Sequence, residues 1–129
     1  MQLVGIGIDT VEISRIAKSV AHKRFLERVY SAEELALFSS KRAPIPSMAG
    51  NWAAKEAFSK ALGTGVDGFL LSEISVLRNA LGAPELVLTG AAKRLAAGLT
   101  FQVSITHTRS YASAVVIALL EQGGCYSLK

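Results

Sequence analysis

The chain lacks most of the features that staple a small protein or anchor it in a membrane. Its only cysteine is Cys125, so an internal disulfide is excluded and a reducing compartment is compatible with the sequence. No apolar run approaches the roughly 18 residues of a membrane span. The N-terminal segment has no basic region, and Asp9 interrupts its apolar run, so no signal peptide is expected. We therefore expect a soluble, cytoplasmic protein without a membrane partner.

Apolar residues, by contrast, are plentiful: half of the 129 residues are hydrophobic and 19% are charged. A chain of this size and composition can fold around one core, so we expect a single domain, 1–129. The net charge is +4, and the segment 14–28 has the same excess, with five basic residues and one acidic residue. Such a segment suggests an acidic partner, either nucleic acid or an acidic protein, although a solvated helix face is the simpler interpretation.

Hydrophobic spacing, capping residues and turn residues predict an α+β fold with an antiparallel sheet. Ser31 and Glu34 form the capping-box pattern of a helix start, and Gly63 can end the alanine-rich helix before it. Two β-branched runs with a short polar break between them predict a hairpin, and prolines predict a loop at 41–46. The expected helices lie at 13–20, 31–38, 47–62 and 90–97, and the expected strands at 2–8, 72–78, 85–88, 101–108 and 111–120, with a loose tail from Glu121 onward.

Three polar clusters lie where structure alone does not require them. Asp9 follows an apolar strand, where an aspartate is often only the N-cap of the next helix. Glu56 and Lys60 lie four residues apart in an otherwise small and apolar helix, so they could be a plain stabilising ion pair. His107 lies near the end of a strand, where a lone histidine is more often structural than catalytic.

Taken together, these residues suit phosphate chemistry. Two carboxylates from different elements favour a hard cation such as Mg²⁺, and the lack of a cysteine and histidine ligand set argues against zinc. A metal ion, a lysine and a histidine would neutralise phosphate oxygens while a carboxylate accepts a proton from an incoming hydroxyl. The turn at 63–65 could let the backbone approach a phosphate, but it is too short for a nucleotide-binding fingerprint.

Three segments resemble the signature blocks of the holo-acyl-carrier-protein synthases, the compact branch of the 4′-phosphopantetheinyl transferase superfamily. They are GIGIDTVEISRI, NWAAKEAFSKALGTG and SITHTRSYASAVVIAL, in the family's order and spacing, and RVYSAEELALF resembles a further block. The resemblance covers nearly the whole chain. It implies an antiparallel sheet packed against a long central helix. It also implies Mg²⁺-dependent transfer of the phosphopantetheinyl arm of coenzyme A to a serine of an acyl carrier protein, in fatty acid biosynthesis, by a homotrimer with active sites between subunits.

The resemblance further implies roles for individual residues. Asp9 and Glu56 match the magnesium ligands, and Glu56 also matches the general base. Lys60 matches a lysine near the pyrophosphate of coenzyme A, and His107 matches a histidine at its nucleotide phosphates. The residues that match segments bordering the coenzyme A nucleotide are Gly63, Thr64, Gly65, Gly82, Pro84 and Thr108, and those that match the docking helix for the carrier protein are Arg15 and Arg24.

The chain departs from the family pattern at Asn51 and over 18–22, which matches the docking helix only loosely, and two other functions remain open. Many members carry an arginine where this chain has Asn51, which removes a cation that the family places near a phosphate. One alternative function is a coenzyme A-binding module without transferase activity, in which Asp9 and Glu56 only cap and pair. The other is a basic nucleic-acid-binding domain, but the basic segment offers only Phe25 for base stacking. We therefore expect no nucleic-acid partner.

Overall fold

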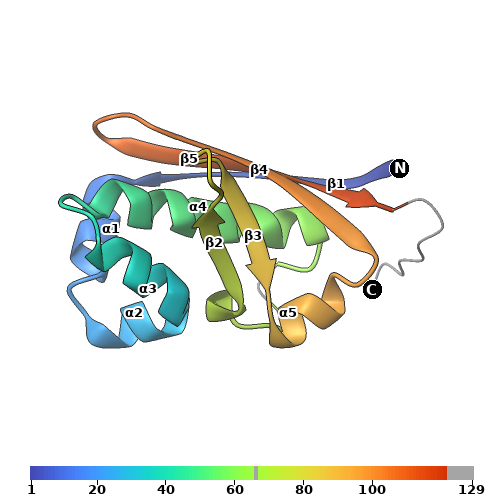
Figure 1. The fold of residues 1–129 in the computed structure, drawn as a ribbon, viewed down its shortest axis with the longest axis horizontal. Coiled ribbons are helices and arrows are strands. Elements are labelled where there is room, and N and C mark those ends of the chain that lie inside the picture. Colours follow the sequence, from blue (N-terminus) through green and yellow to red (C-terminus); the bar gives the residue numbers. More distant parts are fainter. Residues whose placement is uncertain (66, 122–129) are drawn as a thin grey trace.

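The computed structural model describes residues 1–65 and 67–121, so the rest of the predicted loose tail, with Cys125, lies outside the described residues. The strands β1, β5 and β4 form an antiparallel sheet in that order, and β2 and β3 form a separate antiparallel pair. The helix α4 runs along one face of the three-stranded sheet (Figure 1). The predicted α+β fold, with an antiparallel sheet against a long central helix, is therefore confirmed. The elements in chain order are β1 (Gln2–Glu12), α1 (Ile13–Ser19), α2 (Lys23–Val29), α3 (Ala32–Ser39), α4 (Ile45–Leu62), η1 (Leu71–Glu73, a 3₁₀ turn), β2 (Ile74–Arg78), β3 (Pro84–Leu88), α5 (Gly90–Leu95), β4 (Leu99–His107) and β5 (Tyr111–Leu120).

Small residues let α4 lie directly on the sheet. A Cβ atom added to Gly5 would lie 1.9 Å from the carbonyl oxygen of Ala61, and one added to Gly7 would lie 1.9 Å from that of Ala57. Both glycines are therefore required by the close approach of the helix backbone. The buried residues of β5 on the same face are also small: Ala112, Ala114, Val116 and Ala118.

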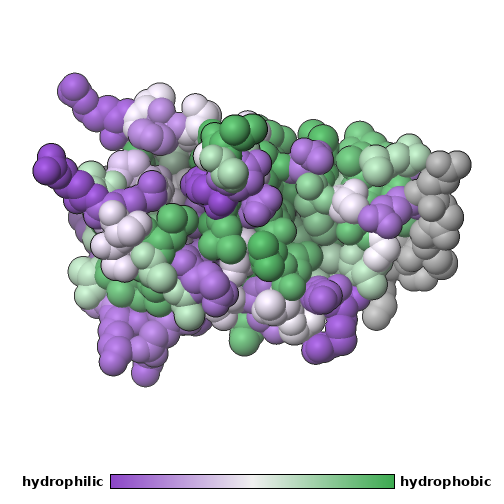
Figure 2. Space-filling view, in the orientation of Figure 1, coloured by the Kyte–Doolittle hydropathy of each residue, from purple (hydrophilic) through white to green (hydrophobic). Residues whose placement is uncertain are grey.

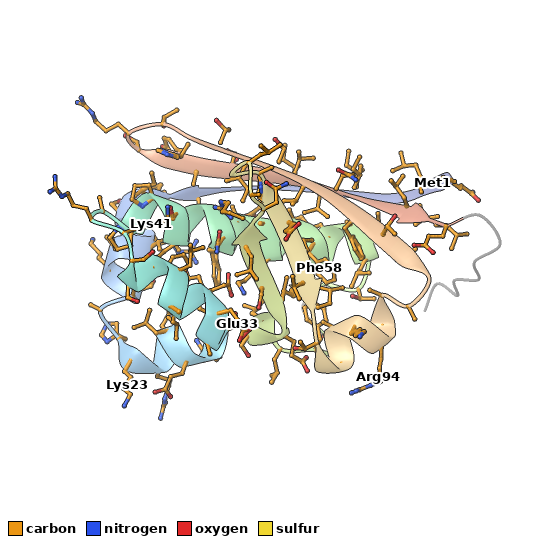
Figure 3. All side chains as sticks on the ribbon, in the orientation of Figure 1. Met1, Lys23, Glu33, Lys41, Phe58 and Arg94 are labelled. Carbon is orange, nitrogen blue, oxygen red and sulfur yellow. The ribbon has the colours of Figure 1, made fainter. Side chains whose placement is uncertain are left out.

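The core is built around α4. Phe58 is fully buried, and its ring centroid lies 5.8 Å from that of Phe69 and 4.9 Å from that of Phe101. Burial of one such aromatic side chain contributes roughly 1.5–3 kcal/mol. Phe58 lies inside the molecule, whereas Lys23 on α2 and Arg94 on α5 extend from its surface (Figure 3). This aromatic cluster joins α4 to β4 and to the segment that leads into η1.

A buried ion pair joins α4 to α3. Lys55 Nζ lies 2.6 Å from Glu34 Oε1, and both side chains are fully buried. The same ammonium donates hydrogen bonds to the carbonyl oxygens of Leu71, at 2.9 Å, and Ile74. Burial lowers the pKa of Lys55, and the charge of Glu34 opposes this shift. Glu34 also accepts the backbone N–H of Ser31, so the predicted capping box is confirmed and carries a buried charge as well.

The observed elements differ from the predicted ones where tertiary contacts decide. β1 continues to Glu12 because it pairs with β5 along its whole length. α4 begins at Ile45, two residues earlier than expected, because prolines are tolerated in the first turn of a helix. The basic segment 14–28 is divided between α1 and α2. As predicted, Gly63 ends α4, in the left-handed conformation with φ 78°.

The face of the three-stranded sheet that points away from α4 carries no helix in the described part of the chain (Figure 1). Large apolar side chains on β1 are exposed there, with Ile6 and Ile8 each 64% exposed. An exposed apolar face of this kind is typical of a protein–protein contact. Among the helices of residues 1–65 and 67–121, none is both long enough and apolar enough to cross a membrane.

Candidate active site

The close contact between β1 and α4 brings Asp9 to Lys60. Side chains on one face of a strand recur every second residue, so Asp9 follows Gly5 and Gly7 on the face that meets α4. Lys60 Nζ donates hydrogen bonds to Ile8 O at 2.8 Å and to Asp9 Oδ1 at 3.3 Å. Both charges remain accessible, with the side chain of Lys60 53% exposed and that of Asp9 19% exposed.

Two simpler interpretations of these residues are wrong. Asp9 lies within β1 and does not cap the next helix, because the N-cap of α1 is Glu12 and it makes no side-chain cap. Lys60 forms its ion pair with Asp9 from another element, and no such pair with Glu56 occurs among the described residues. The carboxylate of Glu56 is therefore not taken up by the lysine one helical turn away.

Glu56 lies beside this pair. Burial raises the pKa of Glu56, the negative charge of Asp9 raises it further, and the charges of Lys60 and Arg15 oppose the shift. Arg15, which the family resemblance places in carrier docking, therefore also borders this cluster from α1. Two carboxylates and two cations from β1, α1 and α4 share one place on the surface.

The donor set of Asp9 and Glu56 fits a divalent cation that prefers oxygen. After burial, the negative charge of Asp9 is the second cause that raises the pKa of Glu56, and a bound cation would offset the repulsion between the two carboxylates. Within residues 1–65 and 67–121, no three histidine, cysteine, aspartate or glutamate side chains gather as a complete metal site. Two protein carboxylates suit Mg²⁺, which usually keeps several waters and binds substrate phosphate oxygens.

His107 and Thr108 lie at the opposite edge of the sheet from Asp9, on and just after β4. His107 is the last residue of β4 and is exposed, and its Nδ1 lies 3.3 Å from Thr108 O. It opposes Ala112 of β5, which in turn opposes Val11 of β1. Two strand spacings, roughly 10 Å, therefore separate β4 from β1. A cavity of about 480 Å³ lies next to this hairpin end, lined by Glu12, Ile13, Ser14, Arg109, Ser110 and Tyr111.

The predicted turn at 63–65 and the predicted His107 lie toward opposite ends of α4. Gly63 and Gly65 have φ of 78° and 64°, and the space around both is open. At the other end, a Cβ on Gly50 would lie 2.8 Å from Ile105 of β4, two residues before His107. The 13 residue steps from Gly50 to Gly63 correspond to about 20 Å along the helix axis. One chain therefore does not bring its predicted nucleotide residues together.

The remaining predicted residues lie on the β2–β3 loop and on α2. Gly82, with φ 86°, lies in the loop between β2 and β3, and Pro84 begins β3. Arg24 is exposed on α2. Hydrophilic side chains project from the end of the molecule that carries α1, α2 and α3, while hydrophobic residues gather over its middle (Figure 2). A groove of about 680 Å³ between β3, α5 and β4 does not include the charged cluster.

The amino-acid sequence is similar to proteins of one family. The sequence model of the 4′-phosphopantetheinyl transferase superfamily matches residues 5–116. The holo-acyl-carrier-protein synthase of Thermoanaerobacter sp. is 42% identical over 118 residues, which cover 88% of this chain and 86% of that protein. The synthase of Treponema denticola is 44% identical over 119 residues, which cover 89% and 97%.

Solved structures of the same family share the fold. The synthase of Bacillus anthracis in complex with CoA (3′,5′-ADP) superposes with a TM-score of 0.78 at 32% identity, over 92% of this chain and 97% of that one. The Helicobacter pylori synthase in complex with coenzyme A gives a TM-score of 0.75 at 36% identity, over 88% and 99%. The chain is therefore a member of the 4′-phosphopantetheinyl transferase superfamily, in the group of the holo-acyl-carrier-protein synthases.

Proposed function

We propose that this protein transfers 4′-phosphopantetheine from coenzyme A to a serine of an apo-acyl carrier protein and releases 3′,5′-ADP. The observation that carries the proposal is the cluster of Asp9, Glu56 and Lys60, which joins β1 to α4 at the positions that the family motif assigns. The proposal includes Mg²⁺ as cofactor, a single domain spanning 1–129, a cytoplasmic location and a role in fatty acid biosynthesis.

The exposed cluster suits a direct transfer. When bound, Mg²⁺ would neutralise pyrophosphate oxygens that otherwise repel an incoming nucleophile. Asp9 and Glu56 would hold the ion, and a Glu56 carboxylate oxygen would accept the proton of the carrier serine. The serine oxygen attacks the phosphorus attached to pantetheine, and the bond from that phosphorus to the 3′,5′-ADP oxygen breaks. Lys60 and His107 would stabilise the charge of the departing 3′,5′-ADP, so no covalent enzyme intermediate is needed.

A homotrimer with active sites between subunits would reunite the separated halves of the site. Asp9 and Glu56 lie on one side of a chain, whereas His107 and the β2–β3 loop lie elsewhere on it. The exposed apolar face around Ile6 and Ile8 is a surface that contact with further copies would cover. We expect native mass spectrometry to find three times the chain mass. Ile6→Lys with Ile8→Lys should give monomers, whereas Leu70→Lys, at an exposed leucine outside the sheet, should leave the trimer intact.

The basic residues on α1 and α2 would dock the acidic carrier protein. Arg15 borders Glu56, so a carrier held by α1 would present its serine at the charged cluster. Arg24 lies on the neighbouring helix and is exposed. Opposite charges on the two proteins would speed their encounter and set their orientation.

The deciding experiment is incubation of the protein with coenzyme A, Mg²⁺ and apo-carrier, followed by intact-mass measurement of the carrier. We expect a mass gain of one phosphopantetheine group, its loss with EDTA and its recovery with added Mg²⁺. Coenzyme A binding without any modification of the carrier would indicate the inactive binding module. Tight binding to an oligonucleotide in physiological salt, without coenzyme A binding, would indicate the nucleic-acid-binding domain.

A further inference from the structure

Arg78, the last residue of β2, is a half-buried cation without a carboxylate partner. Its Nη2 donates a hydrogen bond to Asn51 Oδ1 at 3.3 Å, and its Nη1 donates one to Leu77 O at 3.3 Å. Burial lowers the pKa of Arg78, and the charge of Glu34 opposes this shift. In the described residues no ion pair involves Arg78. A guanidinium has five N–H donors, so most of its hydrogen-bonding capacity remains for another group.

The carboxylate whose charge acts on Arg78 already has hydrogen-bond partners. Glu34 is fully buried; its Oε1 accepts hydrogen bonds from Lys55 Nζ and from Ser31 N, and its Oε2 accepts one from Asn51 Nδ2. The charges of Glu34 and Lys55 cancel, so this network keeps one uncompensated positive charge, on Arg78. A partly desolvated cation is stabilised by an anion that completes its partners.

Asn51 fixes the orientation of Arg78. Asn51 is fully buried, and its Nδ2 donates to Glu34 Oε2 at 2.9 Å and to Val76 O at 3.0 Å. Both amide protons are thereby used, which turns Oδ1 toward the guanidinium. Asn51, which departs from the family pattern, therefore accepts a hydrogen bond from Arg78 of β2.

Arg78 also lies where the nucleotide is expected. It directly opposes Pro84 across the β2–β3 pair, and the loop with Gly82 connects the two residues. Asn51 follows Gly50, which packs against Ile105 of β4, close to the strand end that carries His107. Arg78 thus lies at one of the segments that the resemblance assigns to coenzyme A, the β2–β3 loop.

We propose that Arg78 binds a phosphate group of the coenzyme A nucleotide and that Asn51 is its positioning residue; this inference rests on the proposed function. The planar fork of a guanidinium can donate two parallel hydrogen bonds to phosphate oxygens. Lys60 and the carboxylates of Asp9 and Glu56 serve the pyrophosphate in the proposed reaction. The 3′-phosphate and the pyrophosphate are the two groups of the coenzyme A nucleotide that suit a guanidinium.

Calorimetry with coenzyme A and with dephospho-coenzyme A, which lacks the 3′-phosphate, tests the proposal. Arg78→Met keeps the apolar stem and removes the charge, and it should weaken coenzyme A binding about tenfold to a hundredfold. An effect on coenzyme A alone assigns Arg78 to the 3′-phosphate, and an equal effect on both ligands assigns it to the pyrophosphate. The matched control is Arg94→Met, at an exposed cation on α5 (Figure 3), which should bind both ligands as the wild type does.

Further variants separate ligand binding from a structural role. Arg78→Lys keeps a charge without the fork, so its coenzyme A affinity should lie between those of the wild type and Arg78→Met, even if the methionine variant folds poorly. Unchanged coenzyme A affinity in Arg78→Met or Arg78→Lys, or an equal loss in Arg94→Met, would overturn the assignment. The wild-type transfer reaction tests the proposed function separately: normal transfer with an unaffected Arg78 variant overturns only the role of Arg78.

Discussion

Two lysines on α4 form ion pairs that differ in burial. The Lys55–Glu34 pair is fully buried with 2.6 Å between its charged atoms, whereas Lys60–Asp9 has 3.3 Å and side chains that are 53% and 19% exposed. The buried ammonium has three partners, which is all that it can bind. The ammonium of Lys60 has two partners in the described residues, so it can still reach a ligand.

The difference shows how one helix can serve both stability and chemistry. The charged atoms of a buried pair bind only other protein groups, and removing one partner leaves an uncompensated charge in the core. An exposed pair contributes little to stability, because water screens it, but it can exchange partners with an incoming ion or phosphate. Lys55 and Glu56 are adjacent in the sequence, but Lys55 lies on the core side of α4, whereas Glu56 lies at the proposed site.

The largest expected effect is at the exposed cluster. Glu56→Gln and Asp9→Asn should each reduce turnover by a factor of about a hundred to ten thousand, because each substitution removes a proposed metal ligand. Glu56→Gln also removes the proposed general base. Thermal melting should change little, because both side chains reach solvent. The rate of carrier modification by intact mass is the measurement, and full activity of Glu56→Gln would remove both roles from this residue.

The buried pair should show the opposite response. Lys55→Met should lower the free energy of unfolding by about 3–5 kcal/mol, because it strands the Glu34 carboxylate in the core. The double variant Glu34→Gln with Lys55→Met removes both charges and should recover part of this loss. Urea unfolding measures both values. A stability loss below about 1 kcal/mol in Lys55→Met, as for surface pairs, would contradict the comparison.

A smaller effect is expected at the basic helices. Arg24→Glu should reduce the kcat/KM for the carrier roughly tenfold, since a reversed charge slows steered encounter, and should leave coenzyme A affinity unchanged. Arg15→Glu should reduce the kcat/KM for the carrier more than Arg24→Glu does, because the charge of Arg15 also acts on Glu56. Steady-state rates at two ionic strengths check this, because exposed charges act over about 10 Å at 0.1 M salt. Equal loss of carrier and coenzyme A binding in Arg24→Glu would place this arginine at the nucleotide.

The smallest expected effect on stability is at Lys60. Lys60→Met should change the free energy of unfolding by at most about 1 kcal/mol, because its pair with Asp9 is partly exposed. The matched variant is Lys55→Met, on the same helix and with the same substitution. Urea unfolding of the two variants side by side gives the comparison directly. Equal destabilisation would mean that the Asp9–Lys60 contact is structural and not a site.

Local signals in the sequence predicted the elements that depend on neighbouring residues. The capping box of Ser31 and Glu34 and the left-handed end of α4 at Gly63 are confirmed, since each depends on a few consecutive residues. The resemblance blocks predicted the family, which the comparisons confirm. They also selected Asp9, Glu56 and Lys60, whose contacts the structure describes and whose roles remain predictions.

Other features depend on residues far apart in the chain. β1 reaches Glu12 only because β5 offers it a partner, and Asp9 is therefore a strand residue and not a cap. Likewise, nothing near Asn51 in the sequence indicates that Arg78 would lie against it, because β2 follows α4 only after a turn and η1.

The amino-acid sequence by itself determined the capped start of α3, the glycine end of α4 and the family, because these features follow from short-range geometry and from motif order. Only the tertiary structure decided which of the adjacent residues Lys55 and Glu56 is buried. Helix rotation places them about 100° apart, so that Lys55 pairs with Glu34 in the core while Glu56 lies near the like charge of Asp9. Packing across the whole fold decides whether a charged side chain is buried in a low dielectric, where it binds only protein groups, or stays at the surface, where it can bind a ligand.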